Sequence, residues 1–129
     1  MTELETLKYA RSMLLELHKS MIDHERAQYE ELNGKLNAGQ FLNLLLEDQN
    51  FSWLRKFSTL IVEIDELLDL KDGIPPDMID ANLGKIRDLV SMSESDENFR
   101  SKYVNAIQQD VNTAGLQAKL QGLMNVRHE

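Results

Sequence analysis

The sequence predicts an all-α fold: a single-domain bundle of five to six helices with a long N-terminal helix, over residues 1–129. Apolar residues recur at spacings of three and four along the chain, which is the period of an amphipathic helix. No segment alternates between apolar and polar residues with the period of two that a half-buried strand shows. Only six Gly and two Pro interrupt the 129 residues, and the stretches between them consist mainly of good helix formers.

The first helix is expected to run from its cap at Thr2 to Asn33, with Gly34 as the stop signal. At ~1.5 Å per residue, such a helix spans about 48 Å. A globular chain of this length has a diameter of roughly 36 Å. We therefore expect the helix to extend beyond the rest of its domain unless it bends.

Two helices are expected in the next part of the chain. The segment from Ala38 to Glu47 is apolar on several sides, which is typical of a helix buried between others. Asp48-Gln49-Asn50 ends it, and Ser52 is the expected cap of a third helix that reaches about Leu70. The apolar stripe of this third helix has the most regular period in the chain and comprises Trp53, Leu54, Phe57, Leu60, Ile61, Ile64, Leu67 and Leu68.

The last part of the chain predicts two further helices and a tail. Pro75-Pro76 suits the first turn of a fourth helix, and Ser95 or Asp96 caps a fifth, which Gly115 interrupts. Residues 116–129 form a short C-terminal helix or tail that could cover the bundle, dock on a second subunit or receive a partner helix. Besides the third helix, the expected core includes Ile79, Leu83, Ile86, Leu89, Val90, Phe99, Tyr103, Ile107 and Val111.

Charge and composition argue against several functions. Lys and Arg number 14 and Asp and Glu 22, which gives a net charge of −8, and the basic residues come as scattered pairs such as Arg55-Lys56. Nucleic-acid binding needs a surplus of basic residues on one face. The absence of cysteine excludes disulfides and cysteine-ligated zinc sites. The longest apolar run, Leu44 to Leu46, is far shorter than the roughly 20 residues of a membrane span, and no signal peptide is apparent. We expect a cytoplasmic protein without a cofactor.

A polar seam runs along the expected N-terminal helix. Arg11, His18 and Glu25, seven residues apart, lie between two apolar rows: Leu7, Leu14 and Met21 on one side, Leu15, Ile22 and Tyr29 on the other. One interpretation is a polar contact across a subunit interface or around a ligand. The other is a solvated groove between two packing partners. Both interpretations stay open on the sequence.

The seam has the self-complementarity of an antiparallel homodimer. With a two-fold axis at His18, Arg11 faces Glu25 of a second copy and the two His18 side chains meet. Two charged histidines would repel each other there, so protonation should weaken the dimer. The interface residues of this expected homodimer are Arg11, Leu14, Leu15, His18, Met21, Ile22 and Glu25.

The alternative is an enzyme. Two carboxylates three residues apart on a helix can share one Mg²⁺. Glu63, Glu66 and Asp69, with Glu94 and Glu97 as a second group, are similar to the carboxylate pattern of all-α Mg²⁺-dependent nucleotide pyrophosphohydrolases. However, Glu63 and Glu66 lie opposite the apolar stripe, which favours a solvated acidic face. The sequence therefore favours a non-enzymatic bundle that acts through contact with other proteins, most simply as a homodimer.

Overall fold

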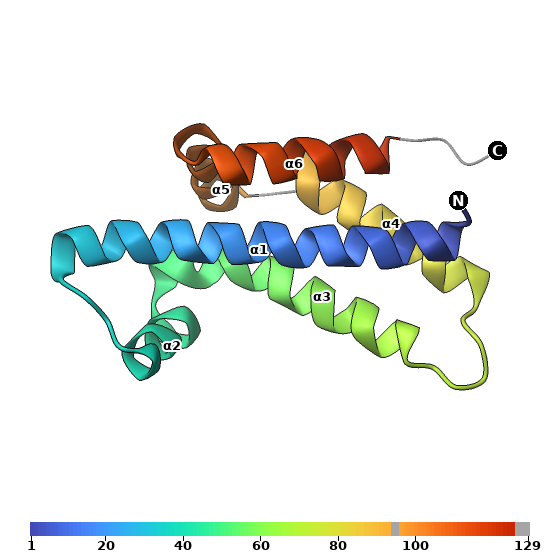
Figure 1. The fold of residues 1–129 in the computed structure, drawn as a ribbon. Coiled ribbons are helices and arrows are strands. Elements are labelled where there is room, and N and C mark those ends of the chain that lie inside the picture. The colour runs from blue at the N-terminus through green and yellow to red at the C-terminus, as the bar shows by residue number, and fades with distance from the viewer. Residues whose placement is uncertain (94–95, 126–129) are drawn as a thin grey trace.

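Figure 1 shows the fold, a computed structural model that describes residues 1–93 and 96–125. Within these ranges there are six α-helices, one 3₁₀ helix and no strand, so the predicted all-α class is confirmed. No helix there has both the length and the apolar character that crossing a membrane requires. The elements are α1 (Glu3–Asn33), α2 (Ala38–Glu47), η1 (Gln49–Leu54), α3 (Arg55–Leu68), α4 (Pro76–Ser91), α5 (Glu97–Gln109) and α6 (Val111–Met124).

The long helix α1 has the predicted bounds. Its first turn is closed by a capping box, in which the Thr2 hydroxyl accepts from the Glu5 N–H and the Glu5 carboxylate accepts from the Thr2 N–H. Gly34, whose φ of 86° suits glycine, ends the helix. Helix α1 runs the full width of the molecule, with α6 along one side and α3 along another (Figure 1). It packs against η1, α3, α4, α5 and α6.

Four aromatic side chains form the centre of the core. Phe57 of α3 stacks on Phe99 of α5 with ring centroids 5.8 Å apart, and meets the edge of Tyr103 at 5.2 Å. Trp53 of η1 lies against the edge of Phe57 at 6.2 Å. Such offset and edge-to-face contacts add to the free energy that burial alone contributes. The core predicted from the apolar stripes is confirmed, except that Leu68, Leu89 and Ile107 are half-buried and Val111 is 89% exposed.

Helix α2 has the predicted bounds but not the predicted surroundings. Of its side chains only Phe41 is buried, and Leu42 and Leu46 are 56% and 60% exposed. The expectation that this helix is buried between others is therefore wrong. Because η1 follows α2 after a single residue, Asp48, the helix folds back on η1 and lies outside the bundle (Figure 1).

The predicted starts of two helices are also corrected. Asp48, not Ser52, caps the turn that leads into α3: its carboxylate accepts from the Asn50 N–H at 2.8 Å, and η1 intervenes before α3 begins at Arg55. The interruption placed at Gly115 lies at Asp110 instead. The Asp110 carboxylate accepts from the N–H of Thr113 at 3.1 Å and from its hydroxyl at 2.6 Å, so a new helix starts there and Gly115 lies inside it.

The end of α3 and the start of α5 lie close to those predicted, and α6 packs on the bundle. Helix α3 ends at Leu68, two residues before the predicted Leu70. Asp96 caps α5, since its carboxylate accepts from the Phe99 N–H at 2.7 Å, and the other expected cap, Ser95, lies outside the described residues. Helix α6 covers the bundle, because Leu120 and Met124 are buried and the helix packs on α1, α4 and α5. Residues 126–129 of the expected tail lie outside the described residues.

The first prediction concerns the aromatic centre. Replacing Phe57 by Ala should lower the free energy of unfolding by ~3–5 kcal/mol, because it removes a fully buried ring and leaves a cavity. Denaturant unfolding monitored by circular dichroism measures the change. Val62→Ala on the exposed side of the same helix is the control, with an expected change within about 0.5 kcal/mol. Equal losses in the two variants would contradict this packing.

Candidate functional site

The polar seam of α1 runs from a partly exposed edge of the bundle at Arg11 to a buried position at Glu25. Arg11 donates two hydrogen bonds to the Asp65 carboxylate of α3, at 2.7 and 3.1 Å. His18 is half-buried and stacks on Phe57 with ring centroids 6.2 Å apart. Glu25 is only 8% exposed. The three side chains are therefore engaged within one chain and face different neighbours.

The apolar residues beside the seam follow the same pattern. Leu14 and Met21 are fully buried in the core of their own chain, and Ile22 is half-buried. Only Leu15, 42% exposed, offers a sizeable apolar surface. Helix α3 contacts two of the seam residues, Arg11 through Asp65 and His18 through Phe57. This use of the seam within one chain favours a different surface for a homodimer.

Burial changes the protonation of two seam residues. It lowers the pKa of His18, because the imidazolium loses hydration there, and a hydrogen bond with the Leu54 backbone opposes this effect. Burial raises the pKa of Glu25, and electrostatic interaction with Lys102 and His24 opposes this rise. Both shifts arise from surroundings inside one chain, so acidification is expected to act on the packing of the bundle.

The carboxylates of the enzyme alternative do not converge. Glu63 accepts a hydrogen bond from Lys85 of α4 at 3.1 Å. Glu66, Asp69 and Glu97 are exposed, and Glu94 lies outside the described residues. Across residues 1–93 and 96–125, no three acidic or histidine side chains lie close enough together to hold a metal ion.

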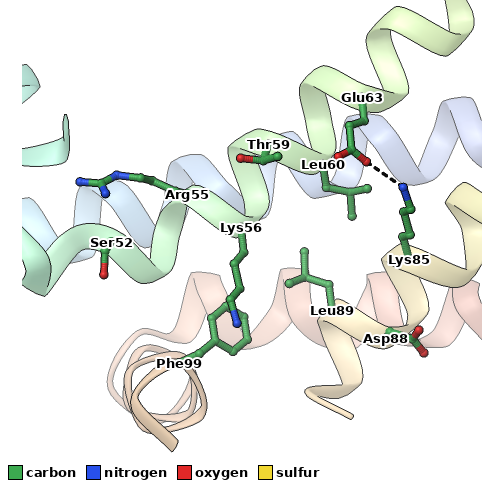
Figure 2. Close-up of a pocket in the computed structure, with 10 residues that line it drawn as sticks. All are labelled: Ser52, Arg55, Lys56, Thr59, Leu60, Glu63, Lys85, Asp88, Leu89 and Phe99. Carbon is green, nitrogen blue, oxygen red and sulfur yellow. Dashed lines mark hydrogen bonds and ion pairs between the residues drawn. The ribbon is translucent and has the colours of Figure 1, made fainter. Parts of the chain in front are cut away.

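A groove of about 450 Å³ lies between α3, α4 and the start of α5 (Figure 2). Its floor is apolar and consists of Leu60, Leu89 and Phe99. Local sequence explains how the groove is lined: Lys56, Leu60 and Glu63 follow one another at helical spacing and share a face of α3. The ion pair between Glu63 and Lys85 connects the α3 and α4 walls (Figure 2).

The rim of the groove is richer in positive charge than the chain as a whole. Lys56 and Lys85 stand against Glu63 and Asp88 in a chain of net charge −8, and the Arg55 guanidinium extends away from the groove. The Lys56 ammonium lies 4.5 Å from the centre of the Phe99 ring and 3.7 Å from the Asp96 carboxylate. An apolar floor inside such a rim suits an apolar side chain that is accompanied by carboxylates.

Sequence reasoning missed this groove. Arg55-Lys56 and Lys85 are scattered along the chain, and only the packing of α3 against α4 brings them to one rim. The signal that could have been used is the i, i+4 position of Lys56 next to Leu60, which places a cation at the edge of an otherwise buried stripe.

The second prediction concerns His18. Its pKa is lower in the folded chain than in the unfolded chain, so protonation favours unfolding. This contribution to stability should be lost as the pH falls from the ordinary histidine pKa of about 6.5 through the lowered value. In His18→Gln, the free energy of unfolding should therefore fall less steeply with acidification than in the wild type. Chemical denaturation at a series of pH values measures the slopes, and parallel slopes would contradict the burial of His18.

The third prediction concerns the carboxylates. Because Glu63 is paired with Lys85 and Glu66 and Asp69 point to solvent, millimolar Mg²⁺ or Mn²⁺ should leave the melting temperature unchanged. A metal ion that binds the native state at converging carboxylates would raise the melting temperature by mass action. Differential scanning fluorimetry distinguishes the two outcomes. A rise that Glu63→Gln abolishes would restore the hydrolase alternative.

Comparison with known proteins gives no relative: no protein-family model, curated protein or solved structure matches the chain.

Proposed function

We propose that the protein is a non-enzymatic helical bundle that acts through protein–protein contact in the cytoplasm, as a homodimer. The observation that carries the proposal is the exposed apolar surface of α2. This helix lies outside the bundle, and its two exposed leucines, Leu42 and Leu46, stand one turn apart on the same side. Contiguous exposed apolar surface is typical of interaction sites.

Helix α2 is held firmly although it stays outside the bundle. The Arg26 guanidinium lies 4.8 Å above the Phe41 ring and donates to the Leu36 carbonyl at 2.8 Å. At the other end of α2, Arg55 donates to the carbonyls of Leu45 and Leu46. An anchored helix presents its leucines at a low cost in conformational entropy, which favours binding.

The groove between α3 and α4 also supports binding more than catalysis. Its charged groups are paired with one another: Glu63 with Lys85, and Lys56 with Asp96. Acid–base or ligating residues would instead converge on a common point where a reacting atom could sit. An apolar floor surrounded by charged side chains is typical of a protein–protein interface, in which the charges contribute to the choice of partner.

The fourth prediction tests the homodimer. Sedimentation equilibrium should give the mass of a dimer at micromolar concentrations and a shift toward the monomer on dilution. A wild type that remains monomeric at high micromolar concentration would contradict the homodimer. Arg11→Glu should leave the dimer intact, because Arg11 pairs with Asp65 of its own chain. Loss of the dimer in a folded Arg11→Glu protein would instead indicate that the interface lies at the seam of α1.

A further inference from the structure

We propose that the α3–α4 groove of each copy receives helix α2 of a second copy, reciprocally, around a two-fold axis. This inference rests on the proposed function, because it names the surfaces through which the proposed homodimer forms. The occupant of the groove is the ridge formed by Leu42 and Leu46, followed by the carboxylate of Glu47.

The shapes and polarities of the two surfaces match. Leu42 and Leu46 are more than half exposed and form a ridge along α2. Gly39 lies one turn before Leu42, and the position of its missing side chain has open space around it apart from the Asn37 side chain, so another helix could approach closely at this end. The floor of the groove, formed by Leu60, Leu89 and Phe99, supplies the apolar surface that such a ridge lacks in its own chain.

The charges of the two surfaces are compatible. Residues 38–47 contain no Lys or Arg, and Glu47 is their single charged residue. The ammonium groups of Lys56 and Lys85 stand at the groove, 3.7 and 3.1 Å from carboxylates of their own chain. A helix with one carboxylate at its C-terminal end could therefore place it beside one of these cations.

The ridge and the groove are neighbours on one molecule, which is what a two-fold interface demands. Arg55 lines the groove and, as Figure 2 shows, extends away from it; its guanidinium donates to the last carbonyls of α2, those of Leu45 and Leu46. In an isologous contact, a single patch contains both complementary halves. An axis between the ridge and the groove would place each ridge on the floor of the other copy's groove.

Interface size favours a second copy over a foreign segment. A ten-residue helix is about 15 Å long and covers only a small area. Stable interfaces bury about 800 Å² on each partner. A single helix in a single groove would fall short of this, whereas the reciprocal arrangement uses two ridges and two grooves and doubles the buried area.

The fifth prediction tests the ridge by substitution. Leu42→Gln combined with Leu46→Gln should raise the dissociation constant of the dimer by about 100-fold or more, because it removes both apolar anchors from each copy. The control is Tyr9→Gln combined with Val111→Gln, which removes two exposed apolar side chains from α1 and α6 and should leave the constant unchanged. Circular dichroism melts establish that both variants fold.

Disulfide trapping tests which surfaces meet, since the chain has no cysteine of its own. A Leu46→Cys chain mixed with an affinity-tagged Thr59→Cys chain should form a mixed disulfide, because Thr59 lines the groove. A Val111→Cys chain mixed with the same Thr59→Cys chain is the control, with background yield expected. Equal yields in the two mixtures would show that the groove does not select α2, and would overturn the inference in favour of another occupant.

The two proposals fail in different ways. A dimer that survives in the Leu42→Gln and Leu46→Gln variant overturns the reciprocal exchange of α2 and leaves the homodimer standing. A wild type that is monomeric at every concentration overturns both.

Discussion

The packing of Phe57 against Phe99 and Tyr103 is the contact on which the rest of the structure depends. It joins α3 to α5, and two hydrogen bonds connect it to α6 and α4. The Tyr103 hydroxyl donates to the Gln117 side-chain carbonyl on α6, and the Gln117 amide donates to the Val90 carbonyl on α4 at 2.8 Å. Buried polar groups that are satisfied in this way fix the position of each helix, because any other arrangement would leave them unpaired.

The groove and the exposed α2 are consequences of this arrangement. Phe99 belongs both to the aromatic centre and to the groove floor, so the groove opens at the edge of the aromatic centre. Phe41 fixes α2 in turn: it meets the edge of Phe51 at 6.2 Å and lies under Arg26. Leu44 and Leu45 also pack against the core, whereas Leu42 and Leu46 stay exposed.

Most of the helix boundaries could be predicted because local contacts determine them. The capping boxes of Thr2 with Glu5 and of Asn37 with Gln40 involve residues three apart, so the sequence alone contains them. The surroundings of α2 depend on which distant segments of the chain pack against it. The apolar composition of the helix does not identify those segments. The sequence predicts an interruption at Gly115, but the break lies at Asp110, whose carboxylate accepts from the backbone N–H of Thr113. A glycine within a helix costs only about 1 kcal/mol, so α6 continues through Gly115.

The seam on α1 shows why a self-complementary pattern is a weak guide to an interface. A row of Arg11, His18 and Glu25 between apolar rows requires an opposing surface with a carboxylate near Arg11 and an apolar face near His18. A second α1 would meet these requirements, and so does α3, which offers Asp65 and Phe57. Contacts within one chain have an advantage, because closing a loop costs only a few kcal/mol and is independent of concentration, whereas association of two copies loses translational and rotational freedom. Apolar side chains that no part of the same chain covers, as on α2, are therefore better candidates for contact with a second copy.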